Sequence, residues 1–200
     1  MAGLAQDLLA LALTLLLSLA QSAWAMDEFE LDDGWQSWDV PAGNSGQRAC
    51  CYHVRQGQVG VEGCRLDRGT GGLTIDSDCE PTSDVVRIYV RLEDGEVTDI
   101  RALSAACPVV TATPARELGA RSPTDSLAWL DRHARGNSEL AEEAVTAMAM
   151  HDDASAFAAL KALVEDRGRD MKVREQALFW LAQSGSEQAF RYLDGLLSAR

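Results

Sequence analysis

The C-terminal part of the chain contains one sequence pattern twice, 33 residues apart. Residues 141–164 (AEEAVTAMAMHDDASAFAALKALV) align without a gap with residues 174–197 (REQALFWLAQSGSEQAFRYLDGLL). Seven of the 24 aligned positions are identical, and most other apolar positions pair with apolar ones. The identical pairs are Glu142/Glu175, Ala144/Ala177, Ala149/Ala182, Ala156/Ala189, Phe157/Phe190, Leu160/Leu193 and Leu163/Leu196. A fixed period of this length is typical of helical repeats, in which each copy buries its apolar face against the next.

Each copy is predicted to form two helices joined by a tight turn. In the second copy, apolar residues recur at helical spacing on both sides of Gly185, and Ser186 is a plausible N-cap for the helix that follows. Asp152 and Asp153 occupy the corresponding corner of the first copy, where aspartate caps helices and tolerates turns. Shifting the pattern back by another 33 residues predicts one more helix over residues 125–134, and therefore five helices in all.

This pattern resembles the HEAT family of α-solenoid repeats, specifically the short bacterial PBS-lyase-like kind. The segment VREQALFWLAQSG, followed by QAFRYLDGLL, carries the resemblance, which covers roughly residues 123–200. The resemblance implies an α-α superhelix that is used for protein binding. It also implies that this region carries no catalytic residues.

The first 25 residues are predicted to be a signal peptide. Residues 8–20 form an apolar run that is short for a membrane span, and Ala-Trp-Ala at residues 23–25 is a small-residue cleavage motif before Met26. No lysine or arginine precedes the run and Asp7 is acidic, so an uncleaved anchor is the alternative. We therefore expect an exported bacterial protein, periplasmic or secreted, with no membrane span after cleavage.

The cysteines indicate a disulfide-stapled region between the signal peptide and the repeats. All five lie there: Cys50, Cys51, Cys64, Cys79 and Cys107. This clustering suits an oxidising compartment, where disulfides stabilise small β-rich domains. Because five is odd, two bridges leave one thiol over, and all pairings remain open from the sequence. Strand proximity favours one bridge from Cys50 or Cys51 to Cys64 and another from Cys79 to Cys107.

Residues 26–110 are predicted to form the β-rich domain that contains these cysteines. Short strands are expected around residues 35–40, 49–55, 59–66 and 73–75. Residues 111–122, punctuated by prolines, are predicted to be an irregular connector to the helical domain at 123–200. The expected fold class is α+β: a small antiparallel β domain followed by a short α-solenoid of HEAT-like hairpins.

The strongest strand pattern lies between residues 84 and 103, where apolar and polar residues alternate. Asp94-Gly95 marks a hairpin turn within it. A three-residue loop would set Val90 opposite Thr98 and keep the apolar residues on one face, placing Ile88 opposite Ile100. We therefore predict that register in preference to a two-residue loop.

Charge and motifs exclude several functions. With 18 basic and 31 acidic residues, the net charge is −13, which argues against nucleic acid and anionic membranes as partners because both bind basic surfaces. The chain contains no G-x-S-x-G, no H-E-x-x-H and no Gly-rich phosphate loop before a helix. We predict a non-catalytic protein without cofactor or metal: a protein-binding adaptor of the bacterial cell envelope.

The candidate protein-binding residues lie on the last two predicted helices. They are Trp180, Phe190, Arg191 and Tyr192. Trp180 stands where the first copy carries only Ala147, so the repeat core does not demand it; core packing is the alternative interpretation. A homodimer through the open helical end is a further option. Trp35 and Trp38, three residues apart, are predicted to be core anchors rather than an aromatic ligand platform.

The alternative function is a redox or metal-handling protein that uses Cys50, Cys51 and His53. Thiolate and imidazole are ligands that zinc and copper(I) prefer, although the spacing matches no standard zinc finger. Two other histidines, His133 and His151, are predicted at helix C-terminal ends, where an imidazolium complements the helix dipole. An enzyme subunit or inhibitor with a helical docking arm is a third interpretation.

Overall fold

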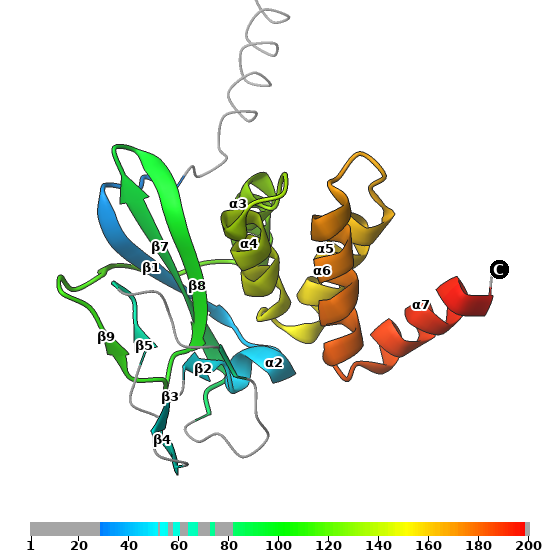
Figure 1. Cartoon of the computed structure of the whole chain (residues 1–200), viewed down its shortest axis with the longest axis horizontal. Coiled ribbons are helices and arrows are strands. Elements are labelled where there is room, and N and C mark those ends of the chain that lie inside the picture. The colour runs from blue at the N-terminus through cyan, green and yellow to red at the C-terminus, as the bar shows by residue number, and fades with distance from the viewer. Residues whose placement is uncertain are drawn as a thin grey trace, which may run out of the picture. The chain divides into compact units, whose positions relative to one another are not determined.

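The computed structural model describes most of the chain after residue 28, and for residues 51, 53–55, 58–60 and 73–74 it describes the backbone alone. The described residues are 29–51, 53–55, 58–60, 64–67, 73–74 and 82–198. By their contacts, the described residues divide after Leu31 into two units, and the second begins at Asp32. The described strands and helices belong to the second unit (Figure 1). The predicted signal peptide lies outside the described residues.

A four-stranded sheet in the order β10-β1-β7-β8 forms the first layer of this unit. Strand β1 (Gly34–Pro41) is antiparallel to β7 (Val85–Glu93), which is antiparallel to β8 (Glu96–Ser104). On the other side, β10 (Arg116–Ala120) runs parallel to β1. The predicted irregular connector therefore contains a strand. Its sequence, RELGA, lies largely exposed at the sheet edge and lacks the apolar alternation that identifies a half-buried strand.

The turn between β7 and β8 differs from the predicted three-residue loop. Glu93 pairs with Glu96, so the loop holds only Asp94 and Gly95. Both residues have positive φ, at 53° and 77°. A two-residue hairpin loop needs such angles because its backbone must follow the right-handed twist of the strands, and Asp-Gly supplies them at low cost.

A β-bulge replaces the longer loop as the device that sets the register. The pairing shifts next to Arg91, after which Val90 lies opposite Ile100 and Ile88 opposite Ala102. The predicted Val90/Thr98 pair is therefore wrong. A bulge adds one residue to one strand, and that extra residue returns the apolar side chains of both strands to one face.

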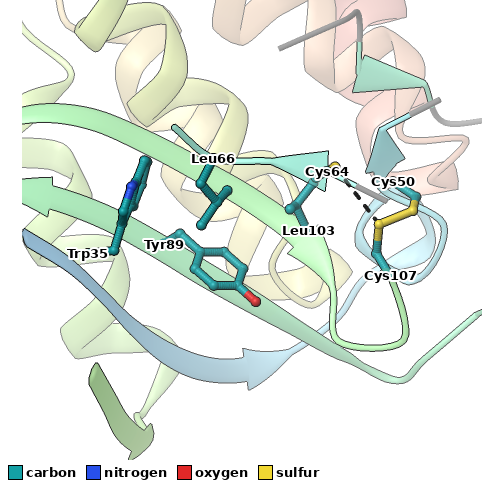
Figure 2. Close-up of a cluster of buried hydrophobic side chains, with 7 residues drawn as sticks. All are labelled: Trp35, Cys50, Cys64, Leu66, Tyr89, Leu103 and Cys107. Atoms are coloured by element: carbon teal, nitrogen blue, oxygen red, sulfur yellow. Dashed lines mark hydrogen bonds between the residues drawn. A yellow bond between two sulfur atoms is a disulfide. The ribbon is translucent and has the colours of Figure 1, made fainter. Parts of the chain in front are cut away.

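The two tryptophans of β1 explain how the sheet can be covered on both faces. Trp35 and Trp38 are three positions apart, so they point to opposite faces of the strand, and they are 7% and 1% exposed. Trp35 packs in a cluster with Tyr89, Leu103 and the cysteines (Figure 2). Trp38 packs edge-to-face against Trp129, with 5.2 Å between ring centroids. The prediction that both are core anchors is confirmed.

The region that contains the cysteines forms short paired strands beside the sheet. The strands are β2 (Cys50–Cys51) with β6 (Leu73–Thr74), β3 (His53–Arg55) with β4 (Gln58–Gly60), and β5 (Cys64–Arg65) with β9 (Val109–Val110). The first two pairs are antiparallel and the third is parallel. Strands thus occur in the predicted stretches, but they are only two or three residues long.

Five helices follow the sheet, as predicted. They are α3 (Pro123–His133), α4 (Glu139–Ala149), α5 (Asp153–Glu165), α6 (Met171–Gln183) and α7 (Glu187–Ser198). The first four begin at polar N-caps whose side chains accept a backbone N–H of the first turn: Ser122, Ser138, Asp152 and Asp170. Within the described part of the chain, no helix has the length and apolar character that a membrane span requires.

Successive helices pack on one another and also on alternate helices. Helix α4 contacts α6, α3 contacts α5, and α4 also packs against β8. Small residues allow the close approach, because Ala144 and Ala177, at equivalent positions of the two copies, are both fully buried. The two copies therefore pack on each other through α4 and α6.

A short helix, α2 (Asn44–Gln47), fixes the sheet to the helices. An added Cβ at Gly43 would lie 2.4 Å from the carbonyl oxygen of His151, and one at Gly46 only 2.1 Å from that of Met150. The Gly43 N–H donates to the Met150 carbonyl at 3.2 Å. Two glycines therefore let this segment pack backbone to backbone on the corner between α4 and α5.

Candidate functional site

The cysteine cluster is a disulfide-bonded core beneath one face of the sheet. Cys50 and Cys107 are bonded, with their Cα atoms 5.5 Å apart, and both are buried beside Leu103 (Figure 2). The Sγ atom of Cys64 lies 3.9 Å from that of Cys107, and Cys64 is disulfide-bonded too. The bridge between Cys50 and Cys107 therefore links β2 to the loop between β8 and β9, and the Cys64 sulfur lies beside it.

The pairing differs from the one predicted. Because Cys107 is bonded to Cys50, the expected bridge between Cys79 and Cys107 and the option of a bridge between Cys50 and Cys64 are both wrong. Strand proximity misled the prediction since the loop after β8 folds back over the sheet face toward β2. Cys79 and the side chain of Cys51 lie outside the described part of the structure.

The metal-handling part of the alternative function loses one of its three residues in the disulfide-bonded state, and the redox part stays a prediction. Cys50 is bonded in a disulfide and cannot act as a thiolate ligand in this state. The side chains of Cys51 and His53 are outside the described residues, so their predicted role stays a prediction. Among the described residues, no group of three or more histidine, cysteine, aspartate or glutamate side chains is placed to hold a metal ion.

The paired aspartates act as structural hydrogen-bond acceptors. Asp152 caps α5 by accepting the Ser155 N–H at 3.1 Å. Asp153 accepts both the backbone and side-chain N–H groups of Asn44, at 3.0 and 2.9 Å. In a second pair, Asp32-Asp33 just before β1, Asp33 accepts the Gly95 N–H at 2.9 Å. These carboxylates hold the β7–β8 turn and α2 in place.

A buried serine–histidine pair was not found by sequence reasoning. The Ser126 Oγ lies 2.8 Å from the His151 Nε2, a contact that nucleophilic catalysis also uses. Both residues are fully buried, at 0% exposure, so no substrate reaches the hydroxyl. The His151 Nδ1 contacts the Ala147 carbonyl at 2.9 Å, and the Trp38 Nε1 donates to the Ser126 Oγ at 2.8 Å. The pair therefore links the sheet to the helices.

Burial shifts the pKa of both His133 and His151 downward, toward the neutral imidazole. Burial lowers the pKa of His151 to about 4, despite its bond to the Ala147 carbonyl. Burial and the neighbouring Arg132 also lower the pKa of His133, whose ring lies against Trp129 with 4.2 Å between centroids. Both shifts act against the imidazolium–dipole interaction that was predicted, most strongly at His151.

A groove of about 420 Å³ opens between β8 and helices α4 and α6. We call it the β8 groove. Its lining residues are Ile100, Arg101, Ala102, Leu103, Glu139, Glu142, Glu143, Thr146, Gln176, Phe179 and Trp180. The first four come from β8, the next four from α4 and the last three from α6, so the groove exists only because α4 packs against the sheet.

The inner wall of the β8 groove is an ion-pair network in which the buried Arg101 Nε alone has no hydrogen-bond partner among the described residues. The Glu143 carboxylate accepts the Ile100 N–H at 2.9 Å and pairs with the Arg101 guanidinium. Arg101 also pairs with Asp99 at 3.2 Å, and only 15% of its side chain is exposed. The positive charge of Arg101 is therefore matched by two carboxylates inside the protein.

The outer wall is aromatic, and this is where the structure places Trp180. Phe179 and Trp180 lie edge-to-face, 5.3 Å apart. Phe179 is 51% exposed, whereas Trp180 is 8% exposed and its Nε1 donates to the Thr146 Oγ1 at 3.3 Å. Trp180 is thus a wall of the groove and is largely unavailable to a flat protein surface.

A second groove, of about 380 Å³, lies where α6 meets α7. We call it the α7 groove. Its lining residues are Leu181, Ala182, Gly185, Ser186, Glu187, Phe190 and Leu193. Phe190 is 68% exposed and Arg191 beside it is exposed as well. Two of the predicted protein-binding residues are therefore accessible at this site.

Tyr192, the other predicted residue of α7, packs inward. Its ring lies edge-to-face against Phe157 of α5, with 6.1 Å between centroids. The Lys161 Nζ lies 5.7 Å from the centre of the same ring, within the range of a cation–π contact. Tyr192 therefore holds α7 on α5 and contributes less to the free surface than Phe190.

Comparison of the two copies shows where apolar surface is left uncovered. Repeat-related residues differ in exposure: Val145 at 0% against Leu178 at 37%, and Leu163 at 1% against Leu196 at 42%. In each pair the residue of the first copy is covered and that of the second is not. The uncovered residues lie on α6 and α7, the same helices that line the α7 groove.

Comparisons with protein-family models, with curated protein sequences and with solved structures give no significant match. The mixed α and β content of the predicted fold class is confirmed by the four-stranded sheet and the helices that follow it. The HEAT-like solenoid stays a prediction.

Proposed function

We propose that this protein is a non-catalytic binding module that receives a helix of another protein in the α7 groove. The HEAT-like pattern of residues 123–200 supports a binding role. So does the accessible lining of the groove, in which Phe190 is 68% exposed.

The observation that carries the proposal is the contrast between Phe157 and Phe190. These residues occupy the same position in the two copies. Phe157 is covered by Tyr192 of the next copy, whereas Phe190 is 68% exposed. In the first copy, this phenylalanine position is thus covered by an aromatic side chain on a helix that packs against the preceding hairpin.

The occupant we propose is one amphipathic helix of a different protein that packs on α7, with the ring contact between Tyr192 and Phe157 as its pattern. An aromatic residue of that helix would contact Phe190 edge-to-face, and its apolar neighbours would lie on Leu193 and Ala182. A second molecule of this protein is disfavoured as the occupant because each molecule carries a net charge of −13.

We also propose that the module acts in the bacterial cell envelope. The disulfide between Cys50 and Cys107 supports this location, since such bridges persist in oxidising compartments. The predicted signal peptide points the same way. An adaptor or sensor with a stapled β region and a helical binding arm is the function we favour.

The test compares two exposed phenylalanines on neighbouring helices. Bacteria express and export protein that carries a photo-crosslinking amino acid at position 190 or at position 179, and the cells are then irradiated. We expect a crosslink at position 190 that maps to a helical, aromatic-containing segment of one partner, and Phe190→Ser to abolish recovery of that partner. Phe179→Ser, the matched control, should leave recovery unchanged.

Two results would count against the proposal. Equal recovery of the partner with Phe190→Ser would reject the α7 groove as the binding surface. A wild-type mass of two chains in solution, reduced to one chain by Phe190→Ser, would show that a second copy covers the groove instead.

A further inference from the structure

We propose that the β8 groove binds an organic cation, namely an ammonium or guanidinium group on a short apolar stem. Its source is either a free amine or the side chain of a lysine or arginine in a peptide. The inference stands apart from the proposed function because the two grooves share none of their lining residues.

The aromatic wall of the groove is a departure from the repeat. Phe179 and Trp180 occupy the positions at which the first copy has Thr146 and Ala147. The repeat core therefore requires neither aromatic ring. Thr146 lines the groove from the first copy, and Phe179 and Trp180 line it from the second.

An exposed aromatic ring beside acidic side chains attracts cations. Phe179 is 51% exposed, and a phenyl face binds ammonium and guanidinium groups within about 6 Å of its centroid. Glu139 and Glu142, one turn apart on α4, line the same groove. Residues spaced by three share one side of a helix, so both carboxylates can approach one bound charge.

The charge balance inside the groove leaves these carboxylates available. Arg101 is neutralised by Glu143 and Asp99. The other cation nearby, Lys172, lies 3.9 Å from Glu142, and 57% and 45% of the two side chains are exposed. A loose, exposed pair of this kind adds little stability, so an incoming cation can replace the lysine.

The size of the groove fits a small cation. A pocket of about 420 Å³ lies at the lower end of the range for small-molecule sites. Ile100 and Ala102, which share one face of β8, give the groove an apolar floor, and Gln176 adds an amide to its lining. A linear amine or a lysine side chain meets these demands: its methylene stem covers the floor while its charge faces Phe179 and Glu142.

Titration with two probes tests the proposal and separates the two sources. Cadaverine represents the free amine, and a capped, uncharged peptide with one central lysine represents the side chain. Binding is followed by two-dimensional NMR at 20 mM and 150 mM salt. We expect saturable shifts at Phe179 and Trp180, and weakening of about two- to fivefold for Phe179→Leu or Glu142→Gln.

Matched controls lie on the α7 groove. Phe190→Leu and Glu187→Gln make the same chemical changes at an exposed phenylalanine and glutamate outside the β8 groove, and should leave the affinity unchanged. Saturation by cadaverine assigns the site to free amines, and saturation by the peptide alone assigns it to protein side chains. The proposal is overturned if neither probe saturates, or if all four variants bind like the wild type.

Discussion

The Nε2 atom of His151 lies 2.8 Å from the Oγ atom of Ser126, and both side chains are fully buried. The other ring nitrogen contacts a carbonyl oxygen, which can only accept, so Nδ1 carries the proton. The Ser126 hydroxyl then donates to Nε2 while its oxygen accepts from Trp38. Each proton in this series of hydrogen bonds has one position, and this arrangement requires a neutral His151.

Stability is therefore expected to fall as the pH falls below neutrality. The pKa of His151 is about 4 in the folded protein and about 6.5 in the unfolded chain. Between these values the unfolded state binds more protons, so stability rises with pH in this range and is fully present above about pH 6.5. The expected contribution is about 3 kcal/mol.

Urea unfolding of the wild type and of His151→Gln at pH 4, 5.5 and 7 measures this effect. The variant keeps a donor and an acceptor but does not titrate, so its stability should change less across the range. His133 also has a lowered pKa and contributes the same slope to both proteins. An identical pH dependence in the two proteins would show that His151 is not the titrating group.

Removal of the disulfide is expected to destabilise the β region strongly. Cys50 and Cys107 are separated by 57 positions. Closing a loop of that length lowers the conformational entropy of the unfolded chain, which raises the free energy of unfolding by about 4 kcal/mol. The Cys50→Ala/Cys107→Ala double variant should lose about that amount in urea unfolding. Peptide mapping without reduction provides the check: a linked peptide joining Cys79 to Cys107 would contradict the pairing.

Two glycines should respond in opposite directions to alanine. At Gly46 a Cβ would lie 2.1 Å from a backbone oxygen of Met150, which cannot move without separating α2 from the helices. We expect Gly46→Ala to cost more than about 2 kcal/mol. Gly195, in the middle of α7, has nothing within 4 Å, so Gly195→Ala should stabilise the helix by about 0.5–1 kcal/mol.

Thermal unfolding of both variants beside the wild type tests this pair. The same direction of change in both would mean that helix propensity alone governs the two sites. A wild-type melting temperature for Gly46→Ala would show that α2 does not pack closely on the α4–α5 corner.

The elements predicted from the sequence are those whose pattern is local. Alternation revealed β7 and β8, and the 33-residue period revealed all five helices, because each signal lies within one or two elements. The spacing of Trp35 and Trp38 fits neither periodicity, and the structure gives the reason: each tryptophan serves a different face of one strand.

The parts that escaped prediction depend on contacts between distant residues. Strand β10 is recognisable only once β1 pairs with it, and the bulge opposite Arg91 is chosen by the packing of both strands on the helices. Ser126 and His151 are 25 positions apart, and no local pattern relates them. The sequence could predict Phe190 as a site residue because its counterpart Phe157 precedes it by one period. The β8 groove could not be predicted because it forms only when α4 packs on the sheet.

The last prediction separates packing from binding at the two repeat-related phenylalanines. Phe157 is half-buried and contacts Tyr192, so Phe157→Ala should cost about 1–2 kcal/mol of stability. Phe190 is 68% exposed, and Phe190→Ala should change stability by less than about 0.5 kcal/mol. Denaturant unfolding measures both. Two equal losses would mean that Phe190 is packed within the protein and not held open for a partner. If Phe190→Ala leaves stability almost unchanged but abolishes recovery of the partner crosslinked at position 190, this side chain contributes to the stability of the complex.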